Sequence, residues 1–165
     1  MRTAEQIRFL ILAAQREGNR HLMASLSEID LTPAQSEALI IIANHGPLAL
    51  KDLGDMLVCD SGTNPSRIVD RLVSAGLVHR AASEHDRRQI KLTVTPKGDD
   101  KANHVRGIEN QLYDAIDNAL NRVDAETLIE VLRTLTTESP ARAALECRLA
   151  AEKRQHEPHG GRRVN

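Results

Sequence analysis

Residues 64–94 combine an amphipathic helix with a predicted β-hairpin, and this combination restricts the fold more than any other part of the sequence. The apolar side of the predicted helix consists of Ile68, Val69, Leu72 and Val73. The polar side, at the same helical spacing, consists of Asn64, Arg67, Arg71 and Ser74. A helix of this kind needs a core beneath its apolar side and a polar partner on its other side.

The helix is predicted to end at Ala75-Gly76, because glycine tolerates the left-handed conformation that often terminates helices. Two short alternating runs follow, residues 77–79 and 90–95, with a charged segment between them. This pattern predicts a β-hairpin. A helix followed by a hairpin with Arg87 and Arg88 at its tip is the layout of a winged helix-turn-helix, so we interpret the stretch as a DNA-reading element.

The rest of the sequence predicts further helices. Thr32 is a good N-cap and Pro33 suits the first helical position, so a helix should begin there. It should end at Gly46-Pro47, with Gly46 in the C′ turn and the proline preventing continuation. A short helix is predicted over residues 49–58. The outer helices are predicted over residues 4–27, 96–121 and 124–152.

The predicted fold class is mainly α with a small β-hairpin wing, a winged helix-turn-helix with outer dimerisation helices. Four segments are expected: an N-terminal dimerisation helix (residues 1–30), a DNA-binding lobe (31–95), C-terminal dimerisation helices (96–153) and a disordered tail (154–165).

The outer helices carry more apolar surface than a small winged helix can cover, and a two-fold homodimer would bury it. Two reading helices would then lie about 34 Å apart and match a palindromic site. The alternative is that these helices complete a monomer core or contact another protein.

Charge is distributed unevenly along the chain. The formal net charge is −1, yet residues 61–91 contain six Lys and Arg against three Asp and Glu. Phosphate binding requires such a local basic patch and not a basic protein. An aromatic content of 1% argues against single-strand or RNA binding on base-stacking platforms.

Localisation is predicted from what the sequence lacks. Its two cysteines form no metal or redox motif, which favours a reducing compartment. No apolar run approaches the length of a membrane helix, and the first residues form an amphipathic helix and no secretion signal. We expect a soluble cytoplasmic protein without membrane contact.

Four segments of the sequence resemble the MarR (multiple antibiotic resistance regulator) family: LTPAQ, HGPLALKDLGDML, RIVDRLVSAGLVHR and DRRQIKLTVTPKG. The similarity covers roughly residues 5–150 and is most specific over residues 86–98, which join the wing to the next helix. The resemblance implies a homodimeric winged-helix regulator, usually a repressor. In it a small ligand or an oxidant, bound between the DNA and dimer lobes, changes the spacing of the reading helices.

The sequence departs from the family pattern at two points. Between Leu57 and Leu72 it is one residue longer, which Asn64 as N-cap and Pro65 at the first helical position would accommodate. Residues 60–63 are similar to the organic-hydroperoxide-sensing branch. That branch senses through a cysteine in its first helix, where this sequence has none, so the peroxide function is not transferred.

The predicted DNA-binding residues are Ser61, Thr63, Asn64, Ser66, Arg67, Arg71, Arg87 and Arg88. Those at the helix start would bind phosphate, with simple capping as the alternative. Arg67 and Arg71 could contact a guanine edge or a phosphate, or belong to a solvated face. For Arg71, an ion pair with Asp86 is an equal alternative, since the resemblance implies that Asp86 positions the wing. We favour insertion of Arg87 or Arg88 into the minor groove over an ordinary charged turn.

Two further groups are candidates for sensing a signal. Cys59 could be an oxidation switch, although a small core residue is the more common role. Arg16, Arg20 and His21 could line an anion-accepting pocket under the DNA lobe, since aromatic carboxylates are typical ligands of the family; a solvated helix face is the favoured alternative. His45 is interpreted as a helix C-terminal residue whose imidazole suits that end of the dipole.

The sequence therefore predicts a ligand- or redox-responsive transcriptional regulator, expected to be a repressor, that binds a palindromic duplex as a homodimer. Its effector would be a small phenolic or anionic molecule. The alternative is a winged-helix protein-interaction module without DNA binding. No enzyme, cofactor or metal site is expected, because no G-x-S-x-G, H-E-x-x-H, P-loop or dinucleotide-binding motif occurs.

Overall fold

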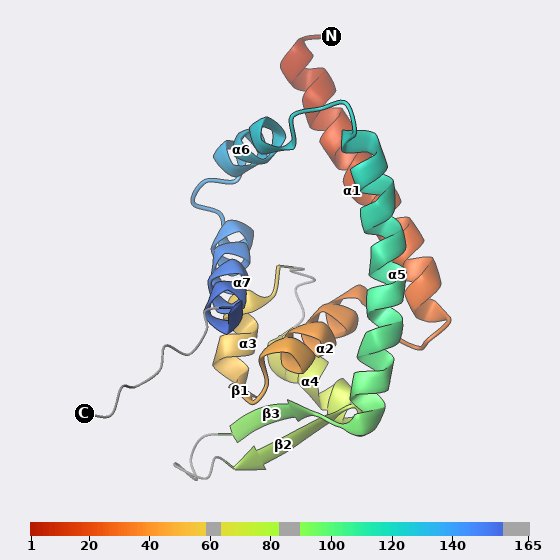
Figure 1. Ribbon diagram of the computed structural model, residues 1–165, viewed down its shortest axis with the longest axis vertical. Coiled ribbons are helices and arrows are strands. Elements are labelled where there is room, and N and C mark those ends of the chain that lie inside the picture. Colours follow the sequence, from red (N-terminus) through yellow and green to blue (C-terminus); the bar gives the residue numbers. More distant parts are fainter. Residues whose placement is uncertain (59–63, 83–89, 157–165) are drawn as a thin grey trace, which may run out of the picture.

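The computed structural model describes residues 1–58, 64–82 and 90–156, and predictions on residues 59–63, 83–89 and 157–165 lie outside the described residues. The elements in chain order are α1 (Thr3–Ser27), α2 (Pro33–His45), β1 (Leu48–Ala49), α3 (Leu50–Met56), α4 (Pro65–Ser74), β2 (Val78–Ala82), β3 (Ile90–Val94), α5 (Pro96–Leu120), α6 (Ala125–Leu135) and α7 (Pro140–His156). The predicted fold class is confirmed: helices dominate, and a small antiparallel sheet lies at one end (Figure 1).

The core of the protein surrounds α2. This helix is apolar on nearly all sides, and an all-round hydrophobic helix is stable only when neighbours cover it. Its neighbours are α1, α3, α4, α5 and β3 (Figure 1). Each contributes fully buried aliphatic side chains, which are Leu26, Leu53, Val69, Leu72, Leu92 and Val105. One aliphatic core therefore joins α4, β3, the end of α1 and the first half of α5.

Local capping explains where the central helices begin. The Thr32 backbone N–H donates to Gln35 Oε1 at 2.9 Å, and the Gln35 backbone N–H donates to Thr32 Oγ1 at 3.3 Å. This reciprocal capping box, followed by Pro33 at the first helical position, confirms the predicted start of α2. α5 starts in the same way, because Thr95 Oγ1 accepts the Gly98 backbone N–H at 2.9 Å.

The sheet has the strand order β1-β3-β2. β2 and β3 form the predicted antiparallel hairpin, with Val78 opposite Val94 and Ala82 opposite Ile90. β1 was not predicted: Leu48 pairs with Leu92, and Ala49 was expected to open the following helix. A strand of two residues is too short to produce an alternating pattern, so sequence periodicity does not detect it.

The role predicted for Gly46 in a C′ turn is wrong. Its backbone is extended, with φ −66° and ψ 150°, and not left-handed. Glycine is required there because two backbone carbonyl groups approach it closely. A Cβ at this position would lie 2.6 Å from the Ile42 carbonyl oxygen and 3.3 Å from the Leu92 carbonyl oxygen. The prediction for Gly76 is confirmed, because it ends α4 with φ 71°.

The start of α5 is fastened to the end of α4. The Lys97 Nζ donates to the Ala75 carbonyl at 2.9 Å, and the Thr95 hydroxyl donates to the Gly76 carbonyl at 2.8 Å. Gly98 lies directly against the Leu77 backbone. These contacts join the end of α4 directly to the start of α5.

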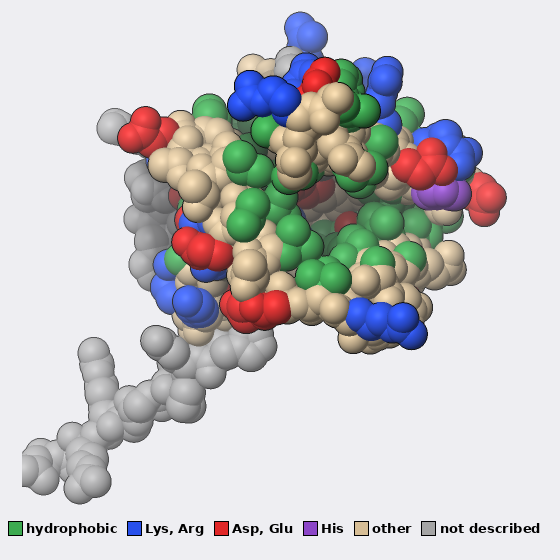
Figure 2. Space-filling model, turned by 90° about the horizontal axis from the view of Figure 1, so that it is seen from above, with side chains coloured by type: hydrophobic (Ala, Val, Ile, Leu, Met, Phe, Trp, Pro, Cys, Tyr) green, Lys and Arg blue, Asp and Glu red, His purple; other side chains and the backbone are tan. Residues whose placement is uncertain are grey.

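The far ends of α1 and α5, together with α6, extend away from the core (Figure 1). Within the described chain α6 has no buried residue, although its apolar residues are spaced to form one side of the helix. Seen from this end, hydrophobic side chains surround a hollow (Figure 2). The exposed apolar residues of these elements include Ile7, Leu10, Ile11, Ile116, Leu128, Ile129, Val131, Leu132 and Leu135.

α7 returns to the core beside α3 and continues to His156, so the predicted tail boundary at Arg154 falls inside this helix. Across the ranges that the structure describes, none of the helices combines the length and apolar character needed to cross a bilayer.

Candidate nucleic-acid interface

The apolar and polar sides of α4 are separated as the sequence predicted. Ile68, Val69 and Leu72 are at most 3% exposed and belong to the core. The polar stripe of α4 is exposed along its whole length and consists of Asn64, Arg67, Arg71 and Ser74. No described part of the chain covers this stripe, so the side chains are available to a partner.

The start of α4 is built by Asn64 and Pro65. Asn64 Oδ1 accepts the Ser66 backbone N–H at 2.9 Å, and Pro65 occupies the first helical position. The predicted cap is therefore confirmed, and it shows how the chain accommodates a proline here. Ser66 is half-buried, whereas Ser61 and Thr63 lie outside the described residues. Phosphate binding at this helix start stays a prediction.

Arg80 is a part of this surface that the sequence analysis missed. Its Nη1 lies 2.8 Å from Asp70 Oδ1, and its Nη2 donates to the Ser66 carbonyl at 3.4 Å. These contacts join β2 to α4 and neutralise Asp70, so Arg67 and Arg71 supply the exposed positive charge of the stripe. Sequence reasoning counted Arg80 only toward local charge, because no local spacing relates it to Asp70.

The tip of the wing lies in residues 83–89, outside the described residues. Asp86, Arg87 and Arg88 lie outside the described residues, and so does the possible ion pair between Arg71 and Asp86. The two strands that carry the tip are described and are paired over their whole length. β2, paired with β3 in this register, lies next to α4.

The three residues proposed to form an anion pocket are not all brought together. Arg20 Nη2 lies 2.5 Å and His21 Nε2 3.0 Å from the Oε1 atom of Glu17, on the same exposed face of α1. The hydrogen bond from Arg20 lowers the pKa of Glu17 to about 2, so this carboxylate is charged at neutral pH. Arg20 is therefore partnered within its own helix, and Arg16 is exposed elsewhere on α1.

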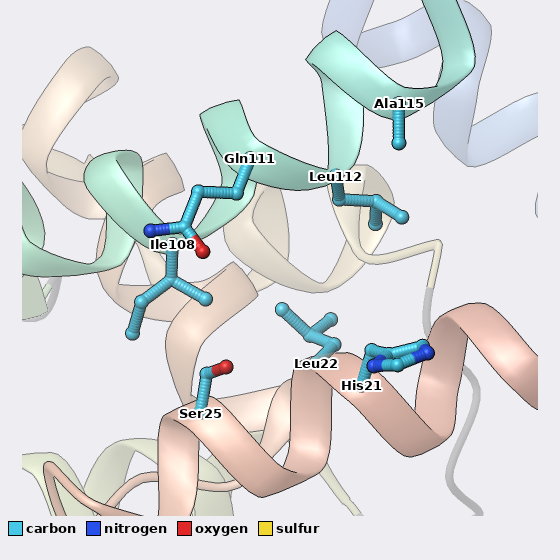
Figure 3. Close-up of a pocket in the computed structure, with 7 residues that line it drawn as sticks. All are labelled: His21, Leu22, Ser25, Ile108, Gln111, Leu112 and Ala115. Atoms are coloured by element: carbon cyan, nitrogen blue, oxygen red, sulfur yellow. The ribbon is translucent and has the colours of Figure 1, made fainter. Parts of the chain in front are cut away.

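His21 does line a pocket, which lies between α1 and α5 (Figure 3). The pocket has a volume of about 280 Å³. Its lining is mostly apolar, with two neutral hydrogen-bonding side chains, and consists of His21, Leu22, Ser25, Ile108, Gln111, Leu112 and Ala115. Figure 3 shows Gln111 reaching from α5 toward Ile108 and Ser25, which places its amide beside the apolar wall.

The remaining candidate residues, the two cysteines and His45, form no site that the described residues show. Cys59 lies outside the described residues, and Cys147 is a half-buried free thiol on α7. His45 lies at the end of α2, but burial lowers its pKa and its Nε2 has no hydrogen-bond partner among the described residues. The interpretation of a charged imidazole on the helix dipole is therefore not supported. Within those same ranges no group of three His, Cys, Asp or Glu residues is placed to hold a metal ion.

Comparison with known proteins gives a consistent result. The MarR family model matches residues 31–90, which span α2 to the first residue of β3. The organic hydroperoxide resistance transcriptional regulator of Bacillus subtilis (strain 168) is 32% identical over 98 residues, covering 59% of this chain and 66% of that protein. The HTH-type transcriptional regulator TtmR of Methylorubrum extorquens (strain PA1) is 29% identical over 125 residues, covering 76% of this chain and 60% of that protein. The chain thus spans less than two thirds of the length of these two relatives.

Among solved structures, a mutant MarR from E. coli complexed with operator DNA is similar, with a TM-score of 0.66 and 27% sequence identity. The match covers 79% of this chain and 93% of the other. Both the sequence and the arrangement of elements therefore lead to the same family.

Proposed function

The chain belongs to the MarR family, and on that premise we propose that it is a ligand- or redox-responsive transcriptional regulator, acting as a repressor. The observation that carries this proposal is the exposed polar stripe of α4, which lies opposite the buried side chains of Ile68, Val69 and Leu72. A regulator of this kind works in the compartment that holds its DNA, which we propose is the cytoplasm.

The proposed binding mode places α4 in the major groove of duplex DNA. Arg67 and Arg71 would contact base edges or phosphates, and Arg87 and Arg88 would grip the neighbouring minor groove. Similarity to a MarR protein solved with operator DNA supports this mode. The alternative, a protein-interaction module without DNA binding, is not favoured, because the relatives are named as transcriptional regulators.

We further propose that two copies associate through residues 1–30 and 96–153, leaving residues 31–95 as the DNA-binding lobe. The exposed apolar side of α6 and the hydrophobic hollow beside it support this division. A two-fold arrangement would set two α4 helices about 34 Å apart, the distance between successive major grooves on one side of a duplex.

A mobility-shift or anisotropy titration tests DNA binding, using a labelled duplex that spans the region upstream of the protein's own gene. If about six phosphates are neutralised, log affinity should fall with log salt at a slope of about −5. Absence of a salt-sensitive shift on every upstream duplex tried would contradict the proposal.

Arg67→Ala and Arg71→Ala should each weaken binding by about 1–3 kcal/mol where the side chain contacts a base edge. If an arginine contacts only a phosphate, its substitution should weaken binding to all duplexes by a similar factor and reduce the slope of log affinity against log salt by about 1. The same titration, repeated with duplexes changed at single base pairs, separates the two roles.

The control is Arg122→Ala, an exposed arginine between α5 and α6 and distant from α4 in Figure 1, used once gel filtration shows that this variant associates as the wild type does, because residue 122 lies in the segment proposed for association. It should bind as the wild type does. If Arg67→Ala and Arg71→Ala also keep the wild-type affinity and slope, α4 is not the reading helix.

The pocket between α1 and α5 is our proposed effector site. Its apolar lining, with Ser25 and Gln111 as hydrogen-bonding groups, suits a small uncharged molecule such as a phenol. An anion is less suited, because the charged Glu17 carboxylate lies 3.0 Å from the His21 ring at the pocket edge. Of the two effector classes considered, phenolic and anionic, the pocket supports the first.

Thermal shift with phenol and with benzoate at equal concentration tests the effector class. A ligand that binds only the folded state stabilises it by about 2.7 kcal/mol at one hundred times its dissociation constant. Phenol should therefore raise the melting temperature more than benzoate does, because the pocket suits an uncharged molecule better than an anion. Gln111→Leu should reduce this shift, whereas Asn110→Leu, the exposed neighbour outside the pocket lining, should not. A larger shift with benzoate would contradict the assignment.

A further inference from the structure

A buried carboxylate on α2 holds the chain where it leaves α3. Glu37 is 8% exposed, and its Oε1 accepts the Val58 backbone N–H at 2.9 Å. Val58 is the last described residue before the segment that leads into α4. A hydrogen bond from a backbone amide to a carboxylate oxygen is stronger than one between neutral groups, so this contact holds the end of α3 against α2.

The same oxygen is also the contact point of α7. Arg148 Nη1 lies 3.5 Å from Glu37 Oε1, and Arg148 Nε lies 3.8 Å from Glu152 Oε1. Glu37 and Arg148 are 111 residues apart in sequence. The Glu37 carboxylate therefore contacts both α7, through Arg148, and the end of α3, through Val58.

The surroundings of this pair make its geometry sensitive to movement. α7 packs beside α3, and Ala144 and Cys147 of α7 line a groove whose other wall includes Val58 and Ile68. Burial raises the pKa of Glu109 on α5, whose carboxyl faces Arg148, Glu37, Arg106 and Tyr113. Burial reduces screening, so a shift of Arg148 changes the interaction with Glu37 more than it would at the surface.

From these contacts we infer that Glu37 is a positioning residue, which couples α7 to Val58 at the end of α3 and thereby sets DNA affinity without touching DNA. A displacement of α7 would move Arg148 relative to Glu37 and so change the contact between Glu37 and Val58. This inference rests on the proposed function, because its effect is measured on DNA binding.

Three variants test the coupling: Glu37→Gln, Glu37→Met and Arg148→Met. Glu37→Gln keeps an oxygen acceptor for the Val58 N–H and should retain most of the affinity. Glu37→Met removes the acceptor and should weaken binding to the upstream duplex about tenfold. The slope of log affinity against log salt should stay at the wild-type value, because no phosphate-contacting cation is lost.

Arg148→Met should also weaken binding, and the double variant Glu37→Met/Arg148→Met should bind no more weakly than Glu37→Met alone. Such non-additivity is the sign of a shared interaction. The matched control is Arg142→Met, an arginine of α7 with the same 24% side-chain exposure, which pairs with Glu146 on its own helix. It should keep the wild-type affinity.

Amide hydrogen exchange at Val58 is the second readout and does not depend on DNA. Exchange should accelerate in Glu37→Met and not in Arg142→Met. If the wild type binds no duplex while Val58 exchange responds as stated, the proposed function fails and the structural link stands. Additive effects of the two substitutions, equal losses in Glu37→Gln and Glu37→Met, or unchanged exchange at Val58 would each overturn the inference.

Discussion

Gly98→Ala is expected to destabilise the protein by about 3 kcal/mol, because among the described glycines the Cβ added here meets the shortest contact. A Cβ at this position would lie 1.9 Å from the Leu77 carbonyl oxygen and 2.8 Å from Val94 Cγ2. The Leu77 oxygen is a backbone atom, so it cannot rotate away, and the junction between α4, the hairpin and α5 must open.

Thermal or urea denaturation measures this loss. The melting temperature should fall by about 6–12 °C, at roughly 2–4 °C for each kcal/mol in a chain of this size. DNA binding should weaken as well, since the same junction orients α4 relative to α5.

Gly107→Ala is the matched control, because it adds the same methyl group to the same helix. No heavy atom of the described chain lies within 4 Å of the added Cβ. This variant should gain about 0.5–1 kcal/mol from the higher helix propensity of alanine. If both variants behave alike, the packing of α5 on Leu77 is not as described.

Leu132→Glu is the second substitution with a large expected effect, and it acts on association. Leu132 lies on the apolar side of α6 and is 40% exposed, so the protomer loses little core by its replacement. Burying an unpaired carboxylate between two copies is unfavourable, and the variant should remain monomeric where the wild type is dimeric. Losing the second reading helix should weaken DNA binding by at least about 100-fold.

Light scattering coupled to gel filtration, together with the DNA titration, checks this outcome. Thr134→Glu supplies the control, because it places the same carboxylate on the polar side of α6. It should leave mass and affinity unchanged. The proposed role of α6 in the interface would be wrong if the wild type stays monomeric at all concentrations, or if the Leu132→Glu variant still dimerises.

Sequence reasoning located α4 because the signals of this helix are local. The alternation of buried and exposed positions in α4, the capping by Asn64 and the proline at the first helical position all lie within a few residues of one another. The hairpin was predicted mainly from the alternation in β3, whereas β2 has one buried and four exposed residues and extends to Ala82, beyond the predicted residues 77–79. Periodicity and capping are therefore sufficient for elements that carry their own pattern.

The features that were missed depend on contacts between distant residues. The Arg80–Asp70 pair, the hold of Glu37 on Val58 and the close approach at Gly46 arise only after the chain has folded. One omission was avoidable: Glu17 and Arg20 are three residues apart on a predicted helix, a spacing that by itself suggests an ion pair.

The attachment of α5 to the end of α4 has a mechanical consequence. α5 contains 25 residues and is therefore about 37 Å long, and it runs without a break from the hairpin junction to the far end of the protein. It acts as a lever arm: a tilt of about 5° at the far end displaces the near end by about 3 Å. That displacement is close to the rise of one base pair, about 3.4 Å. In the proposed dimer, a molecule bound between α1 and α5 would need to change the angle of α5 by only a few degrees to misalign the two α4 helices with their half-sites.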